Sequence, residues 1–388
     1  MLNIKSLIEK LELIHQRLKL AIPKNLRPYY ENLDIDHSRG LIVYGQRGVG
    51  KTTFLLYRTL NKPFLYVSVD HPLVTDINIY ELTEAVFKAG YQGIVLDEVQ
   101  YAKDWAVQLK ALYDSFPDLY IWASGSSSLM LKSGSADFSR RFIFKRIPLL
   151  SFREYLYLKH SISLEPVDLF EQEFDCLSKV QSRELLRAFR EHLNSGTRPF
   201  FFEGDYCERL KLVLDKALFH DIPLFLQTIG ERHLKLMRAV LGHLLYSSVP
   251  TLNISSLCRD WQISKEKLYE LLLVMEQTEI LKLIKRKTKE NGFKRGSKIL
   301  LTDPAYYYCF DGDVGTAREA FAVYNLSERY GEIFACYDER ECDYIVKGIK
   351  IEIGGKNKKI KNSDIVLTDE IDLPVRNKIP LYFAGLVY

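Results

Sequence analysis

Cysteine is scarce and scattered in this chain of 388 residues. The six cysteines form no C-x-x-C pair, so neither a zinc-finger spacing nor a disulfide framework is visible. Such cysteine usage suits a reducing cytosol. The sequence therefore gives no sign of a small secreted domain or of a structural zinc site.

Long apolar runs are also absent. No uncharged apolar stretch approaches the ~20 residues that a membrane span needs. The first twenty residues mix Lys and Glu through their apolar positions, which predicts an amphipathic helix and not a signal peptide. We expect a cytoplasmic protein with no membrane partner. The net charge of +4 is mild, so any nucleic-acid partner has to be argued from where basic residues cluster.

The chain is too long for one ordinary domain. Through residues 1–150, short apolar runs alternate with helical patterns, which is typical of βαβ units and a mostly parallel sheet. We expect an α/β domain whose five strands lie at residues 40–45, 63–69, 92–99, 119–126 and 142–149.

Three further regions follow this domain. Residues 151–245 have helical periodicity, and we expect a helical lid subdomain. Residues 246–310 give a helix, a tight turn, a helix and two strands around a polar loop, the layout of a winged helix-turn-helix. Residues 311–388 predict a helix followed by strands at 341–348, 349–355 and 379–388, hence a small α+β domain.

The strand at 40–45 runs directly into a stretch that fits the phosphate-loop pattern G-x-x-x-x-G-K-T. The glycines let backbone N–H groups turn toward phosphate oxygens, Lys51 would reach the β- and γ-phosphates, and Thr52 would ligate Mg²⁺. The helix that follows points its N-terminal dipole at the same anion. The pattern predicts binding of ATP and Mg²⁺ by Gly45, Gln46, Arg47, Gly48, Val49, Gly50, Lys51, Thr52 and Thr53.

Further polar residues stand at or near the ends of other strands. Asp97 ends a buried strand and would hold the metal, while Glu98 would polarise the attacking water. Ser124, at the end of the next strand, offers a hydroxyl to sense the γ-phosphate. Arg140 or Arg141, just before the fifth strand, would reach a neighbouring subunit's nucleotide; a solvated basic turn is an equal alternative.

Together these residues resemble a prokaryotic group of AAA-type P-loop ATPases, in the additional-strand catalytic-glutamate class. The matching marks are GQRGVGKTT, VLDEVQ, ASGSSS, and SRR followed by PLLSFREYL. The resemblance continues to the GTARE and IEIGGKNK segments near the C-terminus. It implies a sheet of order 5-1-4-3-2, Asp97 and Glu98 as the metal and water residues, and an arginine acting between subunits of a homo-oligomer.

The predicted winged helix carries the argument for DNA. Its second helix begins with Lys265 and Lys267, and residues 282–298 hold eight basic residues against one acid, Glu290. Such a cluster neutralises phosphates without sequence preference. We predict double-stranded or branched DNA as a partner, bound through Lys265, Lys267, Lys285, Arg286, Lys287, Lys289, Lys294 and Arg295. A wing that is solvated, or that contacts protein, is the alternative.

Three acids near the C-terminus form a second candidate site. Glu319, Asp343 and Glu352 resemble the restriction-endonuclease-like core, where acids and a lysine bind a divalent metal. The position expected for that lysine is Gly354, and the nearest downstream lysine is Lys356. Without the lysine, a hydroxide nucleophile is poorly stabilised. We therefore expect a degenerate nuclease-like domain that does not cleave nucleic acid.

The combined expectation is an ATPase that acts on or with DNA. Two alternative functions remain open. One is an ATP-controlled switch that binds a protein partner, and the other is an ATP-gated, Mg²⁺-dependent nuclease.

Overall fold

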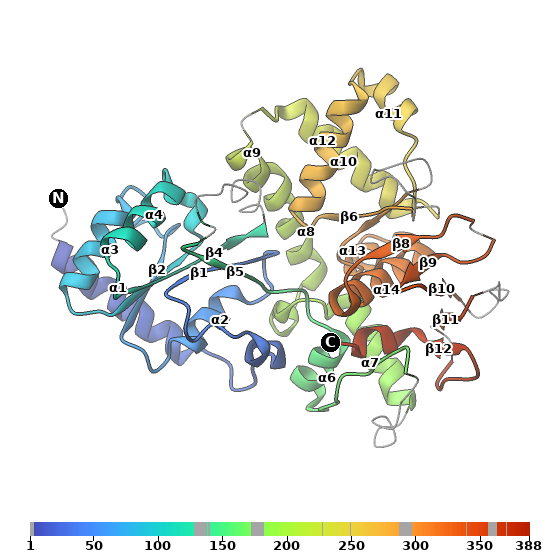
Figure 1. Ribbon diagram of the computed structural model, residues 1–388, viewed down its shortest axis with the longest axis horizontal. Coiled ribbons are helices and arrows are strands. Elements are labelled where there is room, and N and C mark those ends of the chain that lie inside the picture. The colour runs from blue at the N-terminus through green and yellow to red at the C-terminus, as the bar shows by residue number, and fades with distance from the viewer. Residues whose placement is uncertain are drawn as a thin grey trace. The chain divides into compact units, whose positions relative to one another are not determined.

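A computed structural model describes residues 4–127, 138, 140–171, 182–226, 228–248, 250–286, 297–338, 340–355, 363–369 and 371–388 (Figure 1). The chain divides into two compact units, Met1–Pro148 and Leu149–Tyr388, called the first and second units below. Within the described ranges, no helix is both long enough and apolar enough to cross a bilayer.

One parallel sheet organises the first unit. Its strands are β1 (Gly40–Gly45), β2 (Phe64–Ser68), β3 (Gly93–Asp97), β4 (Tyr120–Ser126) and β5 (Ile143–Arg146). They lie in the order β2-β3-β4-β1-β5, with every neighbouring pair parallel. Read from the other edge this is 5-1-4-3-2, so the predicted P-loop topology is confirmed. The continuous apolar runs suit strands buried on both faces.

Helices precede and connect these strands. They are α1 (Ile4–Leu20), α2 (Lys51–Arg58), α3 (Ile79–Lys88) and α4 (Trp105–Ser115), with 3-10 turns η1 (Pro28–Asn32) and η2 (Val99–Tyr101). The amphipathic α1 buries Leu7, Ile8 and Leu11 and contacts β2, α2 and α3. Asn78 caps α3 by accepting hydrogen bonds from the backbone N–H groups of Tyr80 and Glu81.

The second unit begins with helices, as the periodicity predicted. They are α6 (Phe152–His160), α7 (Ser182–Ser195), α8 (Tyr206–Lys216), α9 (Ile222–Phe225) and α10 (Glu231–Tyr246), with η5 (Pro199–Glu203) and η6 (Ala217–Asp221). A capping box starts α6: the Ser151 side chain accepts from the backbone N–H of Glu154, and the Glu154 carboxylate accepts from that of Ser151.

Two helices and a two-stranded hairpin follow at the expected ranges. They are α11 (Ile254–Trp261), α12 (Lys265–Gln277), β6 (Leu281–Ile284) and β7 (Lys298–Leu301), and β6 pairs with β7 in the antiparallel sense. Helices α13 (Ala305–Cys309) and α14 (Val314–Tyr330) then lead into the C-terminal sheet. Ser264 caps α12, which explains why the helix starts at Lys265.

The C-terminal sheet contains β8 (Ile333–Ala335), β9 (Tyr344–Val346), β10 (Ile349–Gly354), β11 (Ile365–Thr368) and β12 (Lys378–Pro380), in the order β12-β11-β10-β9-β8. Strands β8 to β10 pair antiparallel, whereas β10 to β12 pair parallel.

The strand predicted at 379–388 is wrong beyond Pro380. Residues Leu381–Leu386 form a 3-10 helix, η7, whose six residues are all buried and which contacts α14 and α6. A short apolar run buried on all sides does not distinguish a strand from a helix by its periodicity.

The absence of disulfides expected from the spacing is also wrong. Cys207 is bonded to Cys309, and Cys336 is bonded to Cys342. The first pair is separated by 102 residues, and the contact between α8 and α13 brings it together. Sequence spacing cannot reveal such a pair, and the cysteines therefore give no argument for a reducing compartment.

A fully buried ion pair fixes the turn that precedes η5. Arg198 donates to Asp303, and both side chains have no exposed surface. Asp303 also accepts from the Thr197 hydroxyl at 3.1 Å and from the Ala305 backbone N–H at 2.9 Å. The cost of burying the Asp303 charge is therefore offset only while all of these donors are present.

Replacing Arg198 with Met should leave the Asp303 charge buried without its partner. We expect the free energy of unfolding of the second unit to fall by about 3–5 kcal/mol, measured by urea denaturation. Arg209→Ala is the control, because its ion pair with Glu203 is exposed and such pairs contribute at most about 1 kcal/mol. Equal stability of the two variants would contradict a structural role for the buried pair.

Candidate nucleotide-binding site

The loop between β1 and α2 requires its glycines. Gly45, Gly48 and Gly50 have φ values of 151°, 79° and 97°, in the region that side chains disfavour. A Cβ atom on Gly45 would also lie 2.4 Å from the carbonyl oxygen of Ile147. The spacing of the motif therefore follows from a backbone path that other residues would strain.

Lys51 lies buried over this loop, at the start of α2. Its ammonium group donates to the carbonyl oxygens of Gly45 and Gln46, each at 3.0 Å. The side chain is held where the N-terminal dipole of α2 favours an anion. The structure thus brings the predicted phosphate-binding lysine and the loop backbone together.

Asp97, at the carboxyl end of β3, is the meeting point of three hydroxyl groups. Thr52 on α2 and Tyr66 on β2 both donate to Oδ2 at 2.6 Å. Ser124 on β4 donates to Oδ1. Burial, and then the charge of Asp97, raise the pKa of Tyr66, so its phenol stays protonated and donates. Tyr66 is a site residue that no motif predicted.

Glu98 is held by groups from two neighbouring segments. Its carboxylate lies 3.2 Å from Nη1 of Arg47 in the phosphate loop, and Nε2 of Gln100 donates to it at 2.5 Å. Arg47 also donates to the Tyr101 hydroxyl at 3.0 Å. The Glu98 backbone is left-handed, with φ 53°. Non-glycine residues rarely adopt this conformation, which concentrates at functional sites.

Two residues from the segment after α1 support the loop from behind. Nη1 of the buried Arg27 donates to the carbonyl oxygens of Val49 at 2.7 Å and Pro148 at 2.9 Å. The Tyr30 hydroxyl donates to the carbonyl oxygen of Gly50 at 2.8 Å. Sequence reasoning missed both, because this segment has no periodicity and no recognised motif.

The two candidate arginines differ in their surroundings. Arg141 forms a two-pronged ion pair with Asp114 on α4, at 2.8 and 2.9 Å. This pairing lowers the pKa of the Asp114 carboxyl. Arg140 is exposed. Arg141 is therefore engaged within its own chain, and an intersubunit role for Arg140 or Arg141 stays a prediction.

The basic residues of the predicted winged helix are only partly available. Lys265 is exposed, whereas Lys267 pairs with both carboxylate oxygens of Glu270 at 2.9 Å. Lys285 is exposed, and the Arg286 guanidinium lies over the Tyr337 ring. The remaining residues predicted to contact DNA lie outside the described ranges: Lys287, Lys289, Lys294 and Arg295.

The hairpin is also fastened to the C-terminal region of the same unit. Lys282 on β6 donates to the Ser327 hydroxyl on α14 at 2.6 Å. Lys298 on β7 is buried and donates to Glu319 at 2.9 Å. The backbone N–H of Ala335 donates to the Lys285 carbonyl at 2.8 Å. Part of the basic cluster therefore stabilises the fold.

The three nuclease-like acids each bond within the protein. Glu319 also accepts from the Tyr344 hydroxyl at 2.5 Å, and Asp343 accepts from the backbone N–H of Ile353 at 2.9 Å. Glu352 is buried and accepts from Ser363 at 3.4 Å. In the described residues, no three His, Cys, Asp or Glu side chains are placed to hold a metal ion. Lys356 lies outside the described ranges, and absence of cleavage stays a prediction.

Comparisons with known proteins address the first unit most directly. Residues 37–156 match the family described as an AAA domain. An uncharacterized protein of Methanocaldococcus jannaschii is 31% identical over 282 residues, which cover 65% of this chain and 57% of that protein. The chain thus spans little more than half the length of that relative.

A solved structure, the Walker-type ATPase of Pyrococcus abyssi, has 14% sequence identity and a TM-score of 0.41. The likeness covers 75% of this chain and 96% of that one.

The Arg47–Glu98 ion pair generates a testable expectation. Arg47→Ala should raise the basal ATPase rate by up to about fivefold, because partly exposed ion pairs contribute ~0.2–1 kcal/mol and Glu98 must leave this pair to act on water. Steady-state phosphate release at saturating ATP measures the effect. Tyr101→Phe is the control, since it leaves the Glu98 pair intact. A lower rate in Arg47→Ala with unchanged KM would instead show that Arg47 holds Glu98 in its working position.

Proposed function

We propose that this protein binds and hydrolyses ATP at the site around Asp97 and uses the cycle in association with DNA. The observation that carries the proposal is the convergence of Thr52, Tyr66 and Ser124 on one buried carboxylate beside the phosphate loop. Oxygen ligands of this type suit Mg²⁺. Thr52 and Asp97 would hold the ion, which would supply positive charge against the negative charge of the phosphates.

The chain's own residues then divide the reaction between them. Lys51 and the loop N–H groups would bind the phosphates, and the Ser124 hydroxyl would sense the terminal one. Glu98, once released from Arg47, accepts a proton from the water whose oxygen attacks the γ-phosphorus. The bond to the β-phosphate oxygen breaks, and ADP and phosphate leave.

Association with DNA is supported by the exposed basic residues of the helix-turn-helix region. Lys265 lies at the start of α12, and Lys285 follows β6. Contacts of this kind follow the phosphate backbone and carry little sequence preference. The proposed ligand is therefore double-stranded or branched DNA, and the proposed assembly is a homo-oligomer in which Arg140 reaches a neighbouring nucleotide.

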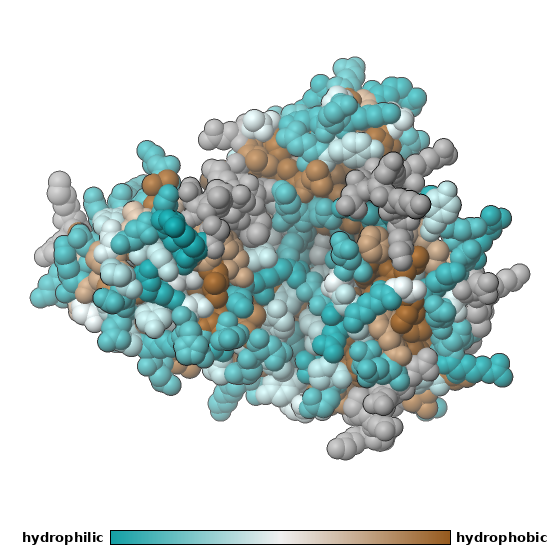
Figure 2. Space-filling view, in the orientation of Figure 1, coloured by the Kyte–Doolittle hydropathy of each residue, from teal (hydrophilic) through white to brown (hydrophobic). Residues whose placement is uncertain are grey.

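A slow, ATP-controlled switch that binds a protein is the second candidate. The Arg47–Glu98 pair favours it, because a restrained base slows turnover. Figure 2 shows hydrophobic side chains over α9, α10 and α12, and Leu224, Tyr246 and Leu273 on these helices are exposed. Apolar surface of this kind is typical of protein contacts.

Two variants test the chemistry. Lys51→Ala should abolish ATP binding, measured by calorimetry. Glu98→Gln should bind ATP normally but hydrolyse it about 10²–10⁴-fold more slowly, because the general base is lost. Near-normal turnover in Glu98→Gln would mean that another residue accepts the proton from the attacking water.

A third variant tests the use of the cycle. Replacing Lys265, Lys285 and Arg286 with alanine should weaken duplex DNA binding. The slope of log K against log salt should become shallower by about 2.7, since each phosphate contact contributes about 0.9. Basal ATPase should not change, but stimulation by DNA should be lost. Fluorescence anisotropy across a salt series measures binding. Turnover of the wild type that is indifferent to every DNA structure would favour the protein-binding switch.

A further inference from the structure

Helix α7 has one face in the core of the second unit and one face on its surface. Leu185, Phe189, His192 and Leu193 are buried, and Phe189 and His192 contact the Phe152 ring on α6. The apolar positions therefore fix the rotation of the helix. A fixed rotation gives the outward side chains a defined arrangement.

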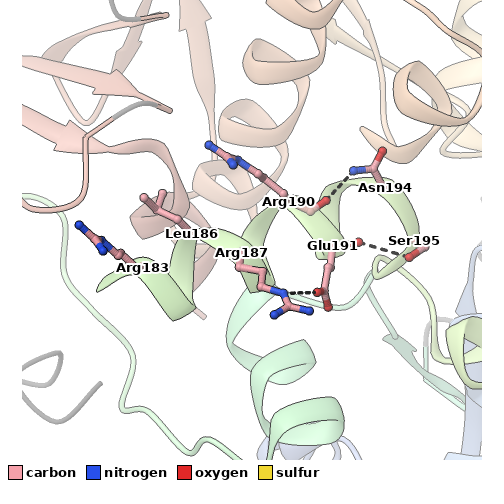
Figure 3. Close-up of a pocket in the computed structure, with 7 residues that line it drawn as sticks. All are labelled: Arg183, Leu186, Arg187, Arg190, Glu191, Asn194 and Ser195. Carbon is pink, nitrogen blue, oxygen red and sulfur yellow. Dashed lines mark hydrogen bonds and ion pairs between the residues drawn. The ribbon is translucent and has the colours of Figure 1, made fainter. Parts of the chain in front are cut away.

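The outward face is basic. Arg183, Arg187 and Arg190 are exposed and project from successive turns of α7 (Figure 3). Arg187 lies 3.3 Å from Glu191, which is also 3.2 Å from Lys159. Over the described part of the chain, no acidic side chain pairs with Arg183 or Arg190. Among the described residues, two of the three guanidinium groups thus have no acidic partner.

These arginines line an open cavity of about 520 Å³ together with Leu186, Glu191, Asn194 and Ser195. Along the helix they are spaced by about 6 Å and then about 4.5 Å, from the rise per residue of an α-helix. That spacing is comparable with the separation of successive phosphates along a nucleic-acid strand. Guanidinium groups bind phosphate through two parallel hydrogen bonds, which makes arginine well suited to this contact.

A second hollow lies against the same helix. Its volume is about 170 Å³, and it shares Leu186, Arg190 and Asn194 with the first. Tyr308 and Val314 supply an aromatic and an apolar wall. Asp369 also lines it and is ion-paired with Arg318. An aromatic wall beside a basic ridge is how proteins hold single strands, with phosphates on cations and bases stacked on rings.

We propose that the outward face of α7 binds a single strand of nucleic acid, with phosphates on the three arginines and a base in the hollow beside Tyr308. The proposal rests on the proposed association with DNA, because a branched substrate carries single-stranded segments. It assigns that contact to α7, an element separate from the helix-turn-helix region.

The test is fluorescence anisotropy of the full-length protein with a labelled oligothymidylate, across a salt series. A triple alanine variant at Arg183, Arg187 and Arg190 keeps good helix formers at exposed positions. It should bind about tenfold or more weakly, and the slope of log K against log salt should fall by about 2, from about 0.7 for each phosphate contact. The charge-matched control replaces the exposed Lys88, Lys211 and Lys235 and should bind as the wild type does.

The base hollow is tested separately. Val314→Met narrows it with a longer neutral side chain at an exposed helix start. It should weaken oligothymidylate binding about fivefold or more, as loss of a stacked base does, but leave an abasic strand unaffected. Tyr308→Phe keeps the ring and should bind normally. An equal loss on both strands would overturn the base hollow.

The failures are distinguishable. If the wild type binds no oligonucleotide or duplex, the proposed DNA function and this proposal fall together. If it binds and the arginine variant matches its control, only the α7 assignment falls. If the variant loses polyglutamate binding while oligonucleotide binding is unchanged, the face belongs to an acidic protein partner and the proposal is overturned.

Discussion

The buried carboxylate of Asp97 ties together the parts of the first unit that make its site. An isolated charge at this depth would be costly, so hydroxyl groups must surround it. Those hydroxyls come from α2, β2 and β4, through Thr52, Tyr66 and Ser124. They meet there because parallel strands bring their carboxyl ends to one edge of the sheet. The phosphate loop is therefore positioned by the same sheet that positions the metal-binding acid.

The second unit handles its charged groups differently. Glu319 is bonded to Lys298 and Tyr344, and the hairpin that supplies Lys298 is fastened to α14 through Lys282. Glu319, from the predicted nuclease-like site, and Lys282 and Lys298, from the predicted wing, thus hold α14 and the β6–β7 hairpin together. Exposed basic residues remain on α7, at the start of α12 and after β6.

Much of the first unit was predictable from sequence because its signals are local. The loop glycines, the strand ending at Asp97 and the alternation of strands and helices lie in short windows. The order of the strands in the sheet was implied by the family resemblance. Contacts between distant segments gave no such signal. Arg27 supports a loop carbonyl 22 residues away, and the Cys207–Cys309 bond spans 102 residues. The Arg47–Glu98 pair joins two motifs that sequence reasoning had treated as independent.

We propose that Asp97 and Thr52 hold the Mg²⁺ that binds with ATP. Calorimetric titration of ATP into wild type and Asp97→Asn, each with and without Mg²⁺, tests it directly. Asparagine keeps the shape and the acceptor oxygen but removes the charge. We expect Mg²⁺ to strengthen ATP binding to the wild type and to have little effect on ATP binding to Asp97→Asn. An equal Mg²⁺ dependence in both proteins would contradict it.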